Sequence, residues 1–263
     1  MGSREDDLEL ALELADVADS MTVESFRAEG LVVENKPDQT PVTEADRAVE
    51  RKVRALLAQA RPGDVVAGEE YGPGEEAADG GRRWIVDPID GTKNYVRGIP
   101  VWATLLALEE GEQITVAVAS APALHRRWWA ARHNGAFMTD GVGDTKRLRV
   151  SGVSELAEAQ LSFAGFEDWE AKGRLDALLE LGRRCWRTRA FGDFWGYMLV
   201  AEGAVEISCE PVVELWDLAA PQLIVEEAGG RFTDLSGEPR AGGGSGVGTN
   251  GMLHEAVLEI VGL

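Results

Sequence analysis

A chain of 263 residues with 44% hydrophobic and 27% charged residues is long enough for a substantial core and has the composition of an ordinary soluble globular protein. Its formal net charge of −20 argues against nonspecific binding to nucleic acid or to an anionic membrane, because the phosphate groups of either would repel it. The three histidines form no HExxH pattern and no ligand-spaced pair, which argues against a zinc site or a Ser-His hydrolase and leaves carboxylates with hard cations as the tools for chemistry.

Two amphipathic helices are predicted at the start of the chain. Apolar residues at helical spacing predict the first over residues 6–26, and the second begins after Thr43. Thr43 has the character of an N-cap, and Asp46 falls at the third helical position, where a carboxylate favours the positive end of the helix. A short strand at 31–33 and a turn-rich loop at 35–41 are expected between the two helices.

A strand-like run, Trp84-Ile85-Val86, ends abruptly in two carboxylates, Asp87 and Asp90. Pro88 between them fixes its own φ and lacks a backbone donor, so the turn is stiff. Two convergent carboxylates suit a hard cation such as Mg²⁺, and the N–H groups of the Gly91-Thr92 turn would point at an anion, as they do at a helix N-terminus. The plain alternative for this run alone is an Asp-Pro turn with an Asp helix cap.

Further strands are expected on both sides of this run. Before it, a strand at 65–67 ends at Gly68-Glu69-Glu70, and a Gly- and Pro-rich loop follows at 72–81. After it, turn residues separate strand-like runs, which predicts hairpins and an antiparallel sheet; the runs are 101–108, 114–120, 127–131 and 136–138.

The second half of the chain is predicted to alternate helix and strand. Pro221 is expected in the first turn of a helix that begins at Trp216, where proline is tolerated. The run Gly242–Gly248 lacks the GK[ST] ending of a nucleotide-binding loop and is interpreted as a flexible connector. The other predicted helices are 174–184, 194–202 and 252–260, and the predicted strands are 185–189, 205–208 and 231–233.

Carboxylates therefore recur where strands end or helices begin, and they do so in an ordered set of motifs. Gly68-Glu69-Glu70, the run from Trp84 to Thr92, and Trp216-Asp217 with the downstream Glu226-Glu227-Ala228-Gly229-Gly230 resemble the inositol monophosphatase family of Mg²⁺-dependent, lithium-sensitive phosphatases. The resemblance extends from Asp46 to Asn250.

This resemblance implies one domain over residues 1–263 with a mixed α/β fold, layered helix–sheet–helix–sheet–helix (αβαβα). The first half, about residues 1–145, would hold a large, mostly antiparallel sheet, and the second half, about 146–263, a smaller one. It also implies a homodimer. Two cysteines without CxxC spacing and the lack of a signal peptide favour reduced thiols in a cytoplasmic protein.

The resemblance further implies two to three Mg²⁺ ions at one site. Glu69, Asp87 and the carbonyl of Ile89 would bind the first ion, Asp87, Asp90 and Asp217 the second, and Glu69 a weaker third. Three further roles are carried over. Asp46 and Thr92 would orient and deprotonate the attacking water, and the backbone amides of Gly91 and Thr92 would hold the phosphate. Glu70 would be an outer-shell acid.

Within the family, Lys93 after Thr92 and the run from Phe191 to Phe194 are similar to the bacterial histidinol-phosphate phosphatases. L-Histidinol phosphate carries an ammonium and an imidazole, so acidic, aromatic and amide side chains at the pocket rim would suit it. The candidate substrate-binding residues are Asn94, Trp102, Asp193 and Glu210, together with Arg189, for which a subunit contact is the alternative.

Three classes of function remain open at this point. The favoured one is a metal-dependent phosphomonoesterase for L-histidinol phosphate, with inositol 1-phosphate or a broader range of sugar and nucleotide monophosphates as the alternative substrates. The others are a noncatalytic scaffold that keeps the fold and a phosphate-binding protein that uses the Gly91-Thr92 amides without turnover.

Overall fold

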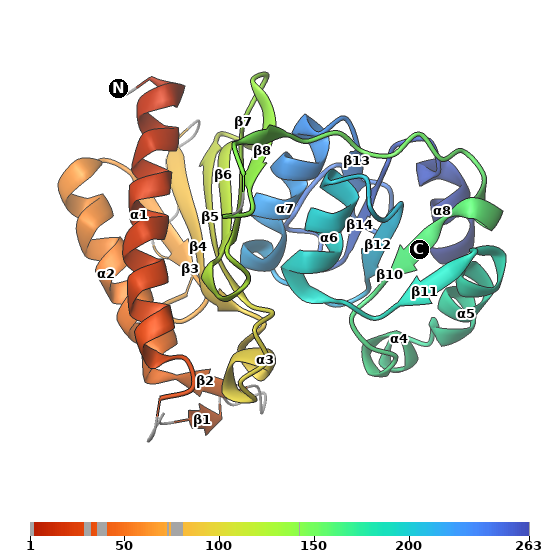
Figure 1. Cartoon of the computed structure of the whole chain (residues 1–263), viewed down its shortest axis with the longest axis horizontal. Helices are drawn as coiled ribbons and strands as arrows, with labels where there is room; N and C mark the ends of the chain where they lie inside the picture. The colour runs from red at the N-terminus through yellow and green to blue at the C-terminus, as the bar shows by residue number, and fades with distance from the viewer. Residues whose placement is uncertain are drawn as a thin grey trace.

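The computed structural model describes residues 3–28, 33–35, 41–72, 74, 81–141 and 143–262. Its layers alternate between helix and sheet along the longest axis of the molecule (Figure 1). This arrangement confirms the predicted mixed α/β fold with the order helix–sheet–helix–sheet–helix. Parts of the strand expected at 31–33 and of the loops expected at 35–41 and 72–81 lie outside the described residues.

The larger sheet has seven strands in the order β3-β4-β5-β6-β7-β8-β9. Each neighbouring pair is antiparallel except β3 with β4, which is parallel, so the predicted hairpins are confirmed. Because β3 and β4 are parallel neighbours, the turn after β3 and the end of β4 lie side by side at the carboxyl ends of these strands. The strands are β3 (Val65–Gly68), β4 (Arg82–Asp90), β5 (Ala103–Glu110), β6 (Gln113–Ala121), β7 (Arg126–Ala131), β8 (Gly135–Thr139) and β9 (Lys146–Arg147).

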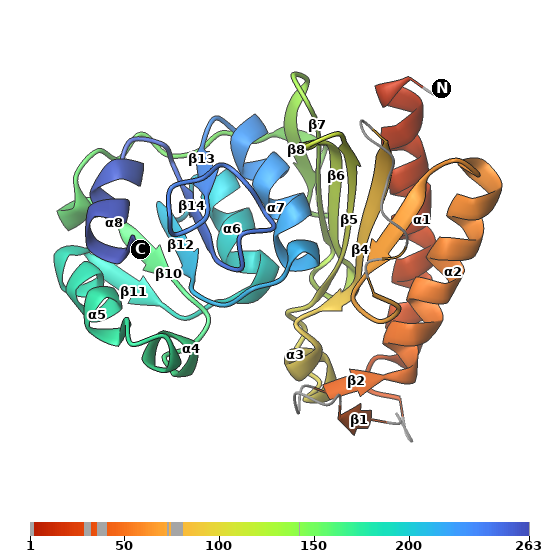
Figure 2. The same cartoon turned by 180° about the vertical axis from the view of Figure 1, so that it is seen from behind.

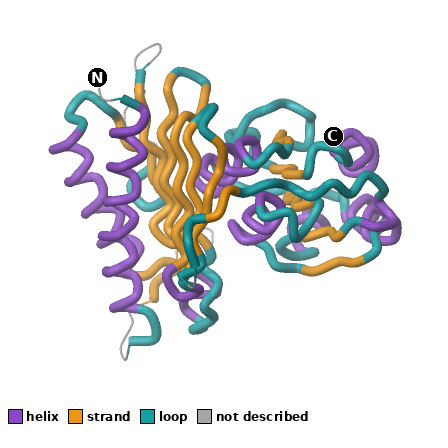
Figure 3. The backbone as a smooth tube through the Cα atoms, turned by 45° about the horizontal axis from the view of Figure 1, so that its top comes forward, coloured by secondary structure: helices purple, strands orange, loops and turns teal. Residues whose placement is uncertain are grey.

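Two long helices, α1 (Arg4–Ser25) and α2 (Glu44–Ala60), cover the outer face of this sheet (Figures 2 and 3). The spacing of apolar residues along each helix gives it one buried stripe, and these stripes pack on Trp84 and Val86 of β4 and on the same face of β5 and β6. Thr43 is the N-cap of α2 and Asp46 its third residue, and together they form the predicted capping box.

Between the two sheets lie α6 (Asp193–Ala201) and α7 (Leu215–Glu227). Their side chains join the inner face of the large sheet in one cluster of buried residues that includes Ile85, Tyr197 and Leu218. Since α7 is surrounded by protein, it is apolar on all sides rather than amphipathic. Pro221 lies in the interior of α7, so its expected place in the first turn was wrong by one turn.

The smaller sheet has five strands in the order β11-β10-β12-β14-β13, and α5 (Leu175–Arg184) and α8 (His254–Val261) cover its outer face. The interpretation of 242–248 as a flexible connector was wrong at its end, because residues 246–249 form a buried inner strand. The strands are β10 (Gln160–Ser162), β11 (Arg187–Arg189), β12 (Ile207–Glu210), β13 (Arg231–Thr233) and β14 (Gly246–Thr249).

The remaining elements are short and were not all predicted. A two-stranded sheet and a one-turn helix lie below the large sheet, close to the end of β4 (Figure 2). None of the described helices combines the length and the apolar character that spanning a bilayer requires. The elements are β1 (Val33–Asn35), β2 (Pro41–Thr43), α3 (Thr92–Val96) and α4 (Glu167–Ala171), with 3-10 turns at Pro122–Leu124 and Leu156–Glu158.

Candidate active site

The two carboxylates that end β4 lie in an irregular part of that strand. The regular pairing with β5 shifts between Asp87 and Asp90, with Pro88 in between. The Asp87 Oδ1 accepts a hydrogen bond of 3.0 Å from the backbone N–H of Ile89, which fixes this carboxylate against its own turn. Gly91 then adopts a left-handed conformation (φ 81°) that glycine permits, and α3 begins. This local geometry places both side chains on one side of the strand end.

Asp217 joins them from α7, which lies in the middle layer. Its position is set by the N-terminal capping of that helix, where the Asp217 Oδ2 accepts a hydrogen bond of 2.8 Å from the N–H of Glu214. Oxygen atoms of Asp87, Asp90 and Asp217 all lie within 4.8 Å of one another. The predicted convergence of these three side chains, which are far apart in the sequence, is therefore present.

Strong electrostatic repulsion acts within this cluster. Burial raises the pKa of Asp87 well above its ordinary value, and the nearby Glu69 charge adds to the effect. Burial also raises the pKa of Asp90, with the Asp193 charge as the next cause, and it raises the pKa of Asp217 to about 7. A bound cation would remove this repulsion, and an all-oxygen ligand set fits a hard divalent ion.

Asp46 lies beside Glu69 at the start of α2 and is completely buried. One of its oxygens, Oδ2, accepts hydrogen bonds from the N–H (2.8 Å) and the hydroxyl (2.5 Å) of Thr43, whereas the buried Oδ1 has no hydrogen-bond partner among the described residues. Burial raises the pKa of Asp46 to about 6 against the opposing bonds from Thr43, and the Glu69 charge adds to the rise. A carboxylate with this pKa can accept a proton at neutral pH.

Thr92 was expected to act together with Asp46, but the two do not share a hydrogen bond in the described structure. The Thr92 hydroxyl instead donates to the carbonyl of Ile89 at 2.9 Å. That carbonyl has a second lone pair, so it stays available as a metal ligand. The two side chains are therefore not joined by a direct hydrogen bond among the described residues.

Three of the predicted substrate residues, Asn94, Asp193 and Glu210, lie near the start of α6. The Asn94 Nδ2 donates to the carbonyl of Val101 (2.9 Å) and to the Asp193 Oδ2 (3.3 Å), and Asp193 itself has a positive φ of 49°. Burial raises the pKa of Asp193 to about 6 and that of Glu210 to about 8, and the Asp193 charge contributes to the rise at Glu210. An acidic region therefore continues from the metal-ligand candidates toward the second half of the molecule.

The other two predicted substrate residues differ in their surroundings, since one is buried and the other is exposed. Trp102 is fully buried and packs against Tyr95 and Phe26, with ring centroids 5.0 and 5.3 Å away, so its ring has no solvent-facing side. These aromatic partners, at the C-cap of α1 and on α3, surround it in the core, and the sequence does not reveal them. Arg189 is exposed on the edge strand β11, and its described hydrogen bond goes to the carbonyl of Thr188.

Sequence reasoning missed one backbone group and one side chain near the cluster. The N–H of Phe194 donates to the Asp90 Oδ2 at 2.8 Å and so ties the start of α6 to the end of β4. No sequence pattern reports such a contact. Glu50 accepts a hydrogen bond from the N–H of Glu70, the predicted outer-shell acid, at 2.7 Å. Its spacing of four residues from Asp46 could have revealed it, because both lie on one face of α2.

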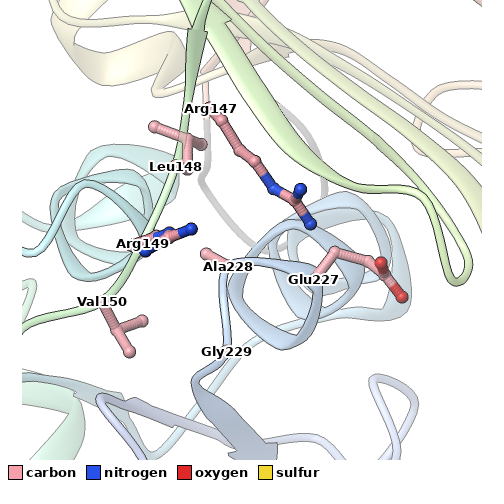
Figure 4. Close-up of a pocket in the computed structure, with 7 residues that line it drawn as sticks. All are labelled: Arg147, Leu148, Arg149, Val150, Glu227, Ala228 and Gly229. Atoms are coloured by element: carbon pink, nitrogen blue, oxygen red, sulfur yellow. The ribbon is translucent and has the colours of Figure 1, made fainter.

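One pocket lies away from these carboxylates. A pocket of about 380 Å³ lies between the segment 147–150 and the end of α7. Figure 4 shows that the side chains of Arg147 and Arg149 reach toward it, while the Glu227 carboxylate turns away. That carboxylate accepts hydrogen bonds from the backbone N–H groups of His133 and Gly135. The pocket lies about 15 Å along α7 from Asp217, since each helical residue rises 1.5 Å, and it is not part of the acidic cluster.

Sequence and structure comparisons agree with this geometry. The model described as "Inositol monophosphatase family" matches residues 3–262. A histidinol-phosphatase of Mycobacterium tuberculosis is 55% identical over 253 residues and one of Streptomyces coelicolor is 53% identical over 257 residues, each covering 96% of both chains. A solved inositol monophosphatase from Zymomonas mobilis has a TM-score of 0.86 at 30% identity and covers 99% of both chains.

Proposed function

This chain belongs to the inositol monophosphatase family, and we propose that it is a Mg²⁺-dependent phosphatase that hydrolyses L-histidinol phosphate to L-histidinol and inorganic phosphate. The observation that carries the substrate is the identity of 53–55% over 96% of the chain with two histidinol-phosphatases. The solved inositol monophosphatase is 30% identical, which supports the shared fold more than a shared substrate.

The metal-binding residues of the proposal are Glu69, Asp87 and the carbonyl of Ile89 for one ion and Asp87, Asp90 and Asp217 for another, with a third ion at Glu69. Bound Mg²⁺ ions would activate a water molecule and neutralise the charge that develops on the phosphoryl group. Clustered carboxylates with raised pKa values support this role, because their negative charges repel one another until a bound cation neutralises them.

The chain's own groups handle the proton and the phosphate. The free Oδ1 of Asp46 is the proposed acceptor for the proton of the attacking water, and Thr92 orients that water from the other side. The first N–H groups of α3, at Gly91 and Thr92, have no partners within the helix and are the proposed phosphate donors. Glu70, one residue beyond Glu69, stays a proposed outer-shell acid.

The leaving alcohol is chosen by the acidic start of α6. An ammonium group placed beside Asp193 and Glu210 would offset the repulsion that raises their pKa values. Asn94 holds Asp193 in place, so its proposed part is to orient that carboxylate as well as to contact the imidazole. A neutral polyol such as inositol gains less from two carboxylates, which is why inositol 1-phosphate and other sugar or nucleotide monophosphates are the second choice.

A phosphate-release assay on two substrates tests the proposal. We expect kcat/KM for L-histidinol phosphate to exceed that for myo-inositol 1-phosphate by at least about a hundredfold, or roughly 2.7 kcal/mol. Asp193→Asn should close most of this gap by weakening only the first substrate, because an ammonium ion loses its charged partner. Asp144→Asn, at an exposed position between β8 and β9, is the matched control and should change neither value. Comparable rates on both substrates with the wild-type protein would favour the inositol-type alternative.

The same proposal includes a cytoplasmic homodimer. The large exposed hydrophobic residues near β11 and α4 support a subunit contact, since Trp186 is 67% and Phe166 is 49% exposed. Sedimentation equilibrium would give the mass of the particle. A Trp186→Glu variant that stays dimeric would remove this face from the proposed contact.

A further inference from the structure

One face of α2 lies beside the turn that carries Glu69 and Glu70. Asp46, Glu50 and Arg54 follow one another at intervals of four residues, so their side chains lie along one side of the helix. Asp46 belongs to the proposed catalytic machinery, whereas Glu50 and Arg54 have no assigned part. Both Asp46 and Glu50 are 0% exposed.

Glu50 holds the turn that carries Glu69. Its Oε2 accepts a hydrogen bond of 2.7 Å from the N–H of Glu70, and its Oε1 accepts one of 3.3 Å from the N–H of Tyr71. The N–H of Glu69 itself donates to the carbonyl of Val86 in β4 at 3.2 Å. Consecutive amides on both sides of the Glu69 side chain are therefore fixed, one by the sheet and the next two by Glu50.

Arg54 completes the arrangement. It pairs with Glu50 at 2.8 Å between Nε and Oε1, and it donates to the carbonyls of Val66 (2.9 Å) and Gly72 (3.1 Å), which lie before and after the turn. A buried carboxylate is costly unless it is paired and hydrogen-bonded, and Glu50 meets both conditions. The ion pair thus contacts the whole turn, from the strand before it to the residue after it.

Gly68 is the position that lets Glu50 come so close. A Cβ atom there would lie 2.1 Å from Glu50 Oε1 and 2.4 Å from Cδ, which no side chain tolerates. The backbone of Gly68 is not in the left-handed region, so conformational freedom does not explain the glycine. The glycine is explained by the space that the Glu50 carboxylate occupies beside it.

We propose that Glu50 is a positioning residue, which holds the Glu69–Glu70 turn so that the Glu69 carboxylate faces Asp87 and Asp217. The proximity of these charges is visible in the pKa values of Asp87 and Asp217, which the Glu69 charge raises. The role rests on the proposed metal-dependent function, and it extends that function to a residue that touches neither metal nor substrate.

Glu50→Gln tests the role with little change in shape. Glutamine keeps one carbonyl oxygen, but its NH₂ group would face an N–H donor from Glu70, Tyr71 or Arg54, so at least one bond is lost. We expect the Mg²⁺ concentration for half-maximal activity to rise at least about tenfold, as for other groups that orient metal ligands, while kcat at saturating Mg²⁺ stays within about threefold. Calorimetric titration with Mg²⁺ alone should show the same loss of affinity without turnover.

The matched control is Glu206→Gln. Glu206 is 6% exposed and its carboxylate accepts a hydrogen bond of 2.7 Å from the N–H of Gln160, in the small sheet. It lies about 13 Å from Glu210 along the strand direction, so its loss should lower the melting temperature and leave the Mg²⁺ titration unchanged. Gly68→Ala is the second variant: it keeps the Glu50 charge but displaces it, and it should weaken Mg²⁺ binding even if Glu50→Gln does not fold.

The outcomes separate the two proposals. Wild-type Mg²⁺ affinity in Glu50→Gln, or in Gly68→Ala where the first variant does not fold, would overturn the positioning role and leave the phosphatase proposal intact. A wild-type protein that neither binds Mg²⁺ nor releases phosphate would overturn both. Weaker Mg²⁺ binding in Glu50→Gln and Gly68→Ala, with Glu206→Gln unaffected, supports the role.

Discussion

The Asp90 carboxylate has two separate parts, as a hydrogen-bond acceptor and as a member of the carboxylate cluster. One oxygen accepts the Phe194 N–H at 2.8 Å, which needs only an acceptor, whereas the cluster with Asp87 and Asp217 would use its charge. An amide in the same place can still accept a hydrogen bond but carries no charge. Structure and metal binding are therefore separable at this residue.

Asp90→Asn should lower kcat/KM by at least about a hundredfold at millimolar Mg²⁺, because one ion loses an anionic ligand. Its melting temperature in chelator should equal or exceed that of the wild-type protein, because fewer like charges are buried together. Phosphate release and thermal unfolding measure the two effects. Wild-type activity in this variant would remove Asp90 from the metal site.

His254 shows a different kind of buried polar residue, one with a complete set of partners. Its Nε2 lies 2.9 Å from the Thr233 hydroxyl, which already donates to the carbonyl of Asp234, and its Nδ1 lies 3.0 Å from the Thr249 hydroxyl. The network assigns the proton to Nε2 and leaves Nδ1 as an acceptor. Burial lowers the pKa of His254 to about 4, and the Arg231 charge adds to the effect.

The folded-state pKa of about 4 lies below the ordinary value of 6.5, so the folded protein holds fewer protons than the unfolded chain between these pH values. The contribution of His254 to stability is complete above pH 6.5 and is lost as the pH falls toward 4. In urea unfolding, the wild-type free energy should fall roughly 2 kcal/mol more than that of His254→Gln between pH 7 and pH 4, after allowance for solvent screening. His125→Asn, at an exposed left-handed position, should follow the wild-type curve.

At the scale of elements, long periodic segments and short strands with apolar runs, such as β3 and β13, were predictable, whereas β10 and β14 were not. α1, α2 and β4 follow from apolar spacing, and the capping box at Thr43 follows from two side chains. β14 is invisible in the sequence because its glycines carry no hydrophobic pattern; they are small because Tyr197 and Leu218 occupy the space beside them. The strand is explained by its pairing with β12 and β13 and by the side chains of α6 and α7 that pack against it.

Gly246→Ala tests this explanation. Its Cβ would lie 2.8 Å from the Tyr197 hydroxyl and 2.9 Å from a Leu218 methyl carbon, so the core has to shift. We expect the free energy of unfolding to fall by about 1–3 kcal/mol, as for other overpacked cores. Gly242→Ala is the control from the same glycine-rich run, since its nearest contact would be an ordinary 3.8 Å and the position is exposed. Equal effects of the two substitutions in urea unfolding would contradict the packing argument.

The candidate site was also predictable only in part, namely where its residues lie at the ends of predicted elements. Carboxylates at the ends of predicted elements, such as Asp87 and Asp217, converge because topology brings those ends together. Trp102 was placed at a rim because an aromatic residue near a charged site suggests a binding surface, but the choice between core and rim depends on Phe26 and Tyr95, from other segments. Side chains whose surroundings come from several elements are beyond single-sequence patterns.

At the scale of the whole molecule, the two sheets share one core through α6 and α7. The cluster that contains Ile85 of the large sheet also contains Phe232 of the small one, with Leu218 between them. We propose that the chain unfolds as one unit. In calorimetry, the calorimetric and van't Hoff enthalpies should agree within error.

Mg²⁺ at about a hundred times its dissociation constant should raise the midpoint of that single transition by roughly 5–10 °C, because it binds only the folded cluster. Chelator should reverse the shift. Two resolved peaks, with only one of them responding to Mg²⁺, would show that the halves are independent.

Because Asp217 lies late in the chain, on α7, its position has a consequence for the partly synthesised protein on the ribosome. Asp87 and Asp90 emerge early with the strands of the large sheet, while their third partner follows most of the second half. A nascent chain that stops before α7 lacks both the last carboxylate and the helix that covers the inner face of that sheet. On the proposed function, no fragment that ends before α7 is a phosphatase, and translation that aborts there yields a protein with an exposed apolar sheet rather than a weaker enzyme.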